Sequence, residues 1–231
     1  MNITLKTLST GSQANCYILT ANNGEHLILD MGLPIADIKR GLDYDIEHVS
    51  GGICTHEHLD HSRSVKKLKK MGITVFQPYL YDAKRLHTKI GCFDIQSFDV
   101  PHSVDCRAFI IKADDLTFVY ASDFEFIGYD LSKQQINVML IEMNYQMKIM
   151  DGLEVDKHIA HTVRGHASDV TTTEFILHNQ KYLQTVILCH PSQSGNLDKK
   201  EALAELKSKL PEFIDVRWAT PNEEVRLGCP F

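Results

Sequence analysis

Thr55-His56-Glu57-His58-Leu59-Asp60-His61 places three imidazoles and the carboxylate of Asp60 within six residues, directly after the apolar run of residues 49–54. A buried strand over that run and a helix over residues 62–70 would hold these side chains on a strand-to-helix turn. Neutral imidazole binds zinc and similar divalent ions, and a carboxylate serves as a ligand or as a base. The density of such groups therefore predicts a metal site rather than a polar turn with incidental histidines.

Further elements are predicted on both sides of this motif. Asn23-Gly24 is typical of a β-hairpin turn, and Ser168 is a candidate N-cap. Strands are expected at residues 3–8, 16–19, 26–30, 49–54, 73–76, 93–100, 107–111, 116–120, 137–141, 185–188 and 213–218. Helices are expected at 35–42, 62–70, 79–86, 170–179 and 198–210, with an irregular tail after the last strand.

Polar residues recur where apolar strands end, and this pattern predicts the architecture. The positions are Asp30, His56, His102, Asp123, Glu142 and His190. Two mixed sheets with helices outside, a four-layer αββα sandwich, would bury the strands and gather these ends at one edge. We expect residues 1–231 to form a single domain of this kind. Asp30 either caps the following turn or hydrogen-bonds a metal-binding histidine from behind.

Composition limits the substrates and the location. The net charge of −6 argues against a protein that grips long nucleic acids by their phosphates. The basic run between Arg63 and Lys70 fits the solvated face of a helix. No secretory signal or membrane-spanning run is apparent, so a cytoplasmic protein without membrane contact is expected. The six cysteines have no metal-site spacing and are expected to be reduced thiols.

The HxHxDH motif, followed by His102, Asp123 and His190, resembles the metallo-β-lactamase superfamily, whose sandwich fold holds two metal ions. The resemblance implies that the first ion is bound by His56, His58 and His102. It implies that the second is bound by Asp60, His61 and His190, with Asp123 bridging the two. Zn²⁺ is the expected metal and Mn²⁺ the alternative, since His58 stands where flavin-linked di-iron members usually carry Glu.

Four other segments are similar to the YycJ/WalJ-like phosphodiesterases and, more distantly, to ribonuclease Z. They are residues 11–17, 141–144, 165–168 and 189–192. The resemblance implies an exonuclease acting on nucleic-acid phosphodiesters, with Glu142 and His166 as a proton-donating pair. His166 could instead be a structural histidine at a helix entry. Only 20 residues separate His102 from Asp123, which leaves no room for the tRNA-gripping arm of ribonuclease Z.

Hydrolysis of a phosphodiester requires groups of these kinds in any protein family. Two metal ions can hold phosphodiester oxygens and lower the pKa of bridging water, so that hydroxide forms near neutral pH. Asp60 can orient that hydroxide. A histidine supported by a carboxylate, as His166 by Glu142, can protonate the leaving oxygen.

Other functions remain open from the sequence. Cyclic-nucleotide hydrolysis, as in phage anti-Pycsar proteins, is the main alternative because its substrate has one phosphate and needs no basic groove. A glyoxalase II-like thioesterase shares the ligand set but does not use the Glu142 and His166 segments. A non-catalytic, metal-stabilised binding protein and a homodimeric state are further alternatives. Four other histidines are expected to be structural or on the surface: His87, His158, His161 and His178.

Overall fold

The computed structural model describes residues 3–150, 164–193 and 196–228, and its strands form two mixed sheets. The first sheet has the order β13-β1-β2-β3-β4-β5. Its bounds are β1 (Thr4–Ser9), β2 (Cys16–Thr20), β3 (His26–Leu29), β4 (Val49–Ile53), β5 (Val75–Phe76) and β13 (Glu224–Arg226). The second sheet has the order β12-β11-β10-β9-β8-β7-β6. Its bounds are β6 (Arg85–Ile90), β7 (Phe93–Val100), β8 (Cys106–Ala113), β9 (Leu116–Ala121), β10 (Val138–Glu142), β11 (Thr185–Cys189) and β12 (Asp215–Trp218).

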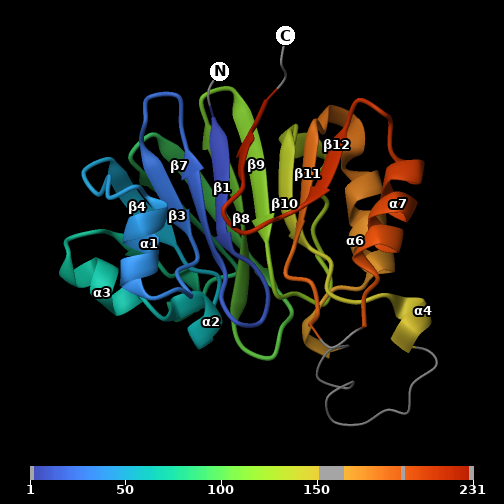
Figure 1. The fold of residues 1–231 in the computed structure, drawn as a ribbon, viewed down its shortest axis with the longest axis horizontal. Helices are drawn as coiled ribbons and strands as arrows, with labels where there is room; N and C mark the ends of the chain where they lie inside the picture. Colours follow the sequence, from blue (N-terminus) through green and yellow to red (C-terminus); the bar gives the residue numbers. More distant parts are fainter. Residues whose placement is uncertain (1–2, 151–163, 194–195, 229–231) are drawn as a thin grey trace.

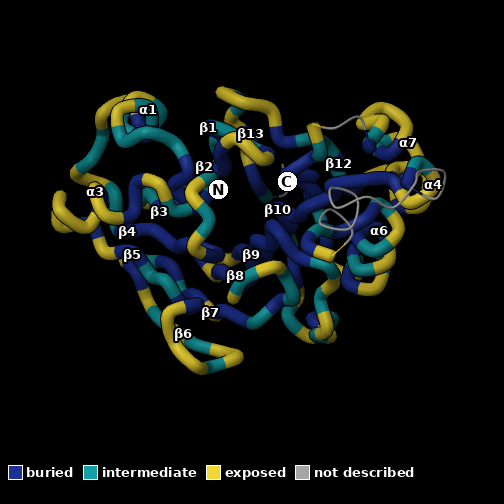
Figure 2. The backbone as a smooth tube through the Cα atoms, turned by 90° about the horizontal axis from the view of Figure 1, so that it is seen from below, coloured by how far each residue is buried: buried dark blue, intermediate teal, exposed yellow. Residues whose placement is uncertain are grey.

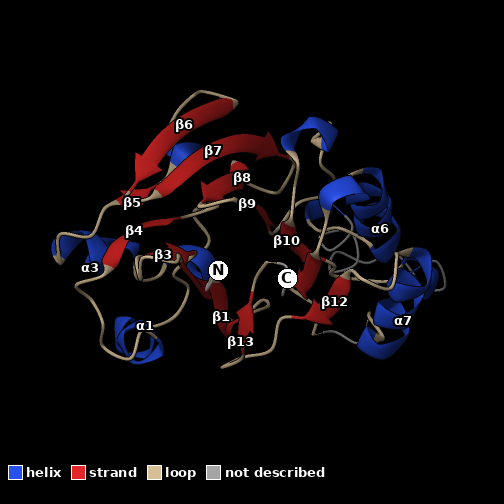
Figure 3. Cartoon of the chain, turned by 90° about the horizontal axis from the view of Figure 1, so that it is seen from above, coloured by secondary structure: helices blue, strands red, loops and turns tan. Residues whose placement is uncertain are grey.

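Helices lie outside the two sheets, which gives four layers (Figures 1 and 3). The helices of the first half are α1 (Ile35–Gly41), α2 (Leu59–Ser62) and α3 (Val65–Lys70). Those of the second half are α4 (Met147–Met150), α6 (Asp169–His178) and α7 (Lys199–Lys209). Three 3₁₀ turns complete the set: η1 (Pro78–Leu80), η2 (Ser132–Gln134) and η3 (Gln180–Tyr182). The αββα sandwich expected from the sequence is confirmed.

Each interface between layers has its own apolar core, and Figure 2 shows the buried strands between the more exposed helices and loops. Tyr17 and Leu19 of β2 face the second sheet, whereas Ile18 between them packs toward α1 and α3. A third cluster joins the second sheet to α6 and α7 through Ile176 and Leu206. Strands buried on both faces read as continuous apolar runs, which is why the sequence marks them clearly.

Strand direction brings the polar strand ends to one edge. In the second sheet, β9, β10 and β11 are parallel neighbours, so their carboxyl ends lie together. β7 is antiparallel to β8, which is antiparallel to β9, so β7 also ends at that edge. In the first sheet, β3 and β4 run parallel. Carboxyl ends of strands are where α/β proteins usually build their sites.

Three local predictions were wrong. The helix expected at 62–70 is split into α2 and α3, because Ser64 donates its backbone N–H to Met31 O and its hydroxyl to Leu33 O. The helix expected at 79–86 is the short η1 followed by β6, which pairs with β7 along its full length. The irregular tail contains β13, which pairs with β1. Each error concerns a segment whose structure depends on a hydrogen-bonding partner outside that segment.

The local turn and cap predictions were correct. Gly24 adopts a φ of 85° in the β2–β3 turn, a conformation that glycine accepts without strain. The hydroxyl of Ser168 accepts a hydrogen bond from Thr171 N at 3.0 Å and caps α6. Asp198 caps α7 by accepting from the backbone N–H groups of Lys200 and Glu201.

Candidate metal centre

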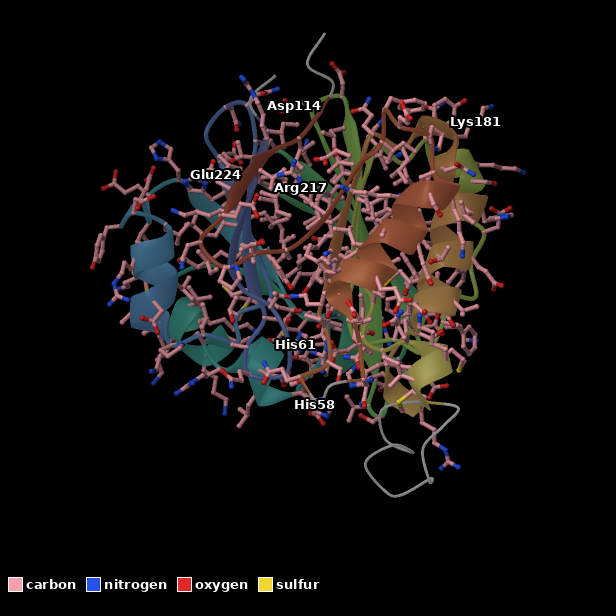
Figure 4. The ribbon with its side chains drawn as sticks, turned by 45° about the vertical axis from the view of Figure 1, so that its right-hand side comes forward. His58, His61, Asp114, Lys181, Arg217 and Glu224 are labelled. Atoms are coloured by element: carbon pink, nitrogen blue, oxygen red, sulfur yellow. The ribbon has the colours of Figure 1, made fainter. Side chains whose placement is uncertain are left out.

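The seven predicted ligands lie together at the end of the sandwich where the strands terminate. Figure 4 shows His58 and His61 at this end, with Asp114 at the opposite end. Two groups of side chains each offer ligand atoms within 4.8 Å of one another. The first group is His56, His58 and His102, and the second is Asp60, His61, Asp123 and His190. The two groups are the same as the two ligand sets expected from the sequence, apart from the bridging position of Asp123.

The buried carboxylate of Asp123 connects the two groups. Its Oδ2 lies 3.8 Å from Nε2 of His56 and 3.8 Å from Nε2 of His102. Its Oδ1 lies 3.4 Å from Nε2 of His61 and 3.3 Å from Nε2 of His190. One oxygen thus faces each set of imidazoles. This is the geometry required of a carboxylate that bridges two cations.

Hydrogen bonds behind three of the histidines orient their rings. The Nδ1–H of His61 donates to Asp30 Oδ2 at 2.7 Å, and that of His102 donates to Gly165 O at 2.6 Å. The Nδ1–H of His190 donates to Glu142 Oε1 at 2.9 Å. Each ring therefore turns its Nε2 toward Asp123, in the orientation that metal-binding histidines usually have.

Two of these Nε2 atoms fit a metal ion particularly well. Within the described part of the chain, Nε2 of His102 and Nε2 of His190 are buried and have no hydrogen-bond partner. A buried polar atom without a partner is costly, and coordination of a cation would remove that cost. Nε2 of His56 and Nδ1 of His58 also face each other at 3.0 Å, as two lone pairs directed at one ion would.

The charges of the site favour a cation. Burial lowers the pKa of His56 well below its ordinary value, and burial also lowers the pKa of His102, so both rings are in the neutral, ligating form. Burial opposes ionisation of Asp123, but His190 and His61 outweigh it and hold the pKa well below its ordinary value. Burial would lower the pKa of His61, yet Asp123 and Asp30 raise it well above its ordinary value. The ionised carboxylates therefore make the electrostatic potential of the site favourable for a cation.

Three of the residues at this edge adopt left-handed backbone conformations. The φ values are 52° at Asp30, 57° at Asp123 and 50° at His190. Each residue follows the end of a strand, so the turn redirects its side chain into the cluster. Such conformations are unusual outside glycine and are often found at functional sites.

Asp30 hydrogen-bonds the ring of His61 from behind, which is the second of the two alternatives predicted for it. Besides His61, its carboxylate accepts hydrogen bonds from the backbone N–H of Thr55 at 2.8 Å and from the hydroxyl of Tyr120 at 2.5 Å. The Thr55 hydroxyl also donates to Asp30 at 2.9 Å. Neither Thr55 nor Tyr120 was predicted to support the site. The position of Thr55 directly before the motif was an available signal, whereas Tyr120 is an ordinary apolar-strand residue in the sequence.

Glu142 and His166 form a contact next to the ligand cluster. Nδ1 of His166 donates to Glu142 Oε1 at 2.7 Å, and the His166 ring stacks on the ring of His190 with centroids 5.1 Å apart. Burial lowers the pKa of His166, but the charge and hydrogen bond of Glu142 outweigh it and raise the pKa to about 9. The imidazole therefore carries a proton near neutral pH.

These two residues, with Asp123 and His190, form a third group whose ligand atoms lie close together. The hydrogen bonds of Glu142 argue against an ion there. Its Oε1 accepts from the rings of His166 and His190, and its Oε2 accepts from the backbone N–H groups of Phe124 and Ala167. Both oxygens are already occupied, so a hydrogen-bonded pair is the better description.

Comparisons with known proteins agree with this arrangement. Residues 9–88, which include Asp30 and the HxHxDH motif, match the profile of the metallo-beta-lactamase superfamily. The metallo-beta-lactamase fold protein YhfI from Bacillus subtilis superposes with a TM-score of 0.74 at 16% identity, over 97% of this chain and 99% of that chain. The chain has the metallo-β-lactamase fold.

Other structures share this metallo-β-lactamase fold. The short form of human tRNase Z has a TM-score of 0.65 at 11% identity, over 98% of this chain and 100% of that one. Zn²⁺-bound PqqB from Methylobacterium extorquens has a TM-score of 0.65 at 10% identity, over 97% and 100% of the two chains. No curated protein gives a significant sequence match.

Gly32 packs directly against the backbone of the HxHxDH motif, and no side chain fits at this position. A Cβ at this position would lie 1.7 Å from the carbonyl oxygen of Asp60, against backbone that is held by the hydrogen bond from Asn15 N. We expect Gly32→Ala to lower the free energy of unfolding in urea by about 1–3 kcal/mol or more, as overpacking does. Gly128→Ala is the control, because its Cβ would meet only Phe126 at 3.6 Å. Equal stability of the two variants would contradict this account.

Two of the four histidines predicted to be structural or on the surface lie within the described residues, and both are on the surface. His87 and His178 are exposed and contact Asp94 and Asp130, respectively. His158, His161 and Cys229 lie outside the described residues. The other five cysteines are free thiols. In the described ranges, no helix combines the length and the apolar character that crossing a membrane requires.

Proposed function

We propose that the protein is a dinuclear metal-dependent hydrolase that cleaves phosphodiester bonds at the ends of nucleic acids. The observation that carries this proposal is the position of Asp123, whose two oxygens each face a separate pair of imidazoles. A structural zinc site uses four protein ligands around one ion and leaves no open position. Seven converging ligand residues fit two ions with room for a substrate.

The residues divide into three roles. One ion would be held by His56, His58 and His102. The other would be held by Asp60, His61 and His190, and Asp123 would bind both ions. When bound, the two ions would polarise the phosphodiester and lower the pKa of water. Asp60, whose Oδ2 lies 3.4 Å from Nε2 of His61, would orient the attacking water and accept its proton.

The Glu142–His166 pair favours a phosphodiester over a thioester. An alkoxide leaving group needs a proton, and His166, protonated and held by Glu142, lies beside His190 and His102 to supply it. A thiolate leaves without such help, so a glyoxalase II-like thioesterase would have no use for the pair. We infer that His166 acts on the leaving oxygen rather than only capping a turn.

Cyclic-nucleotide hydrolysis is the second candidate function, because the net charge of −6 disfavours a long polyanion in general. We expect end-labelled DNA to be degraded at least about tenfold faster than cyclic AMP or cyclic GMP at equal concentration. The assay measures nucleotide release from both substrates by the same zinc- or manganese-loaded protein. The opposite preference would make the cyclic-nucleotide alternative the function.

Metal content tests the proposal most directly. Protein purified without chelator and reloaded with Zn²⁺ or Mn²⁺ should contain about two ions per chain by elemental analysis, because seven ligand residues exceed the needs of one tetrahedral ion. Chelation should abolish turnover of bis(p-nitrophenyl) phosphate, and either ion should restore it. One ion per chain would exclude the dinuclear site. Two ions without turnover would support a metal-stabilised binding protein instead.

A further inference from the structure

A groove of about 810 Å³ opens beside the candidate metal centre. His102 is part of its wall, so the groove borders the ligand cluster. The loop before β6, the ends of β7 and β8 and the loop after β9 form the rest of the wall, including Lys84, Arg107 and Phe126. No step of the proposed hydrolysis uses these three residues.

Arg107 is the unusual residue of the groove. It is 6% exposed, and its backbone N–H donates to Thr55 O at 3.0 Å, which ties it to the residue before His56. Its guanidinium donates to Cys106 O at 3.0 Å and to Ala83 O at 3.4 Å. Within the described part of the chain, Nε is buried without a hydrogen-bond partner.

A buried arginine normally has an anionic partner, because a guanidinium removed from water is otherwise costly. None of the ion pairs among the described residues includes Arg107. The two carbonyl groups fix the orientation of the guanidinium but do not neutralise its charge. A planar guanidinium with unused N–H groups is suited to bind phosphate oxygens.

We propose that Arg107 binds a second, non-scissile phosphate of the substrate, the one next to the bond being cleaved. This inference rests on the proposed phosphodiesterase function and narrows its substrate to a nucleic-acid end with a neighbouring phosphate. Phe126 is 52% exposed on the same wall and offers a surface on which the base of that nucleotide can stack.

The other charges of the groove explain why the substrate is an end rather than a long strand. Asp82, Asp99 and Asp105 also line the groove and outnumber Arg107 and Lys84. A row of phosphates would meet all three carboxylates, whereas one phosphate placed on Arg107 would lie near Asp99 alone, which pairs with Arg107 across the β7–β8 ladder and accepts a hydrogen bond from the Tyr129 hydroxyl. The groove therefore accommodates one further nucleotide.

Three dithymidine substrates test the inference on the metal-loaded protein: one without a terminal phosphate, one with a 5′ phosphate and one with a 3′ phosphate. We expect one phosphorylated form to have a KM about 10–100-fold lower than the unphosphorylated form, as a charged hydrogen bond contributes. Arg107→Gln should remove this difference while leaving kcat on bis(p-nitrophenyl) phosphate within about threefold of wild type. Lys112→Gln, an exposed cation on the same strand, should preserve the difference.

Outcomes that differ from the expected one distinguish failure of this inference from failure of the proposed function. Equal KM values for all three dinucleotides in the wild-type protein would overturn the role of Arg107, even if they are hydrolysed. Failure of the wild-type protein to cleave any dinucleotide or bis(p-nitrophenyl) phosphate would overturn the proposed function itself. If Arg107→Gln does not fold, Arg107→Lys takes its place. It should retain only part of the preference, because it keeps the charge and loses the planar guanidinium, and an unchanged preference would overturn the role of Arg107.

Discussion

Asp60→Ala is expected to reduce phosphodiester hydrolysis by at least about 10⁴-fold, the upper end of the effect of losing a general base alone. Asp60 combines that role with a position in the second ligand group, where its carboxylate faces His61. The side chain is 24% exposed and contributes little to the core, so the fold should survive. Initial rates on bis(p-nitrophenyl) phosphate and DNA, with urea unfolding of the same samples, measure both effects.

Glu57→Ala is the matched control, since Glu57 is an exposed carboxylate of the same motif and belongs to none of the three ligand groups. It should retain near wild-type turnover. Asp60→Asn keeps the shape of the side chain but not its charge or basicity, and should resemble Asp60→Ala. Substantial turnover by Asp60→Ala would remove Asp60 from the ligand and base roles together.

The second large effect is expected for His166→Ala, and it depends on the leaving group. If His166 protonates the leaving oxygen, its loss should reduce turnover of DNA and dinucleotides by about 10²–10⁴-fold. Bis(p-nitrophenyl) phosphate should be hydrolysed at nearly the wild-type rate, because p-nitrophenolate leaves without a proton. Both metal ions should remain bound, since His166 contacts the rings of His190 and His102 but belongs to neither of the two ligand groups assigned to the ions.

Glu142→Gln should shift turnover in the same direction and more weakly. It is a less selective variant, because Glu142 also accepts the Nδ1–H of His190 and two backbone N–H groups. His178→Ala, which removes an exposed histidine paired with Asp130, controls for nonspecific effects. Equal losses on activated and unactivated esters, or loss of metal from His166→Ala, would show that His166 acts in binding or folding.

Local patterns made the fold and the site residues predictable. Strands buried on both faces appear as apolar runs such as Val138–Glu142, and each polar group after such a run lies where its strand ends. Because the two stacked sheets end their parallel strands at the same edge of the sandwich, residues as distant as His56 and His190 were expected to meet, and their Nε2 atoms lie 3.8 and 3.3 Å from the two oxygens of Asp123. Their binding of metal ions stays a prediction.

The sequence by itself determined the αββα architecture and the strand ends that carry polar groups, because these depend on periodicity and on motifs of a few residues. The pairing of Glu142 with His166 was predicted from the resemblance to known phosphodiesterases, and the two side chains do form a hydrogen bond. Only the tertiary structure decided that residues 85–90 and 224–226 are strands, because both are short, largely polar segments stabilised by pairing with β7 and β1. It likewise decided that Tyr120 supports Asp30 and that Arg107 lies buried beside the site, with its Nε lacking a hydrogen-bond partner among the described residues. Such contacts join residues with no local signal, since burial and charge partners depend on the packing of distant segments.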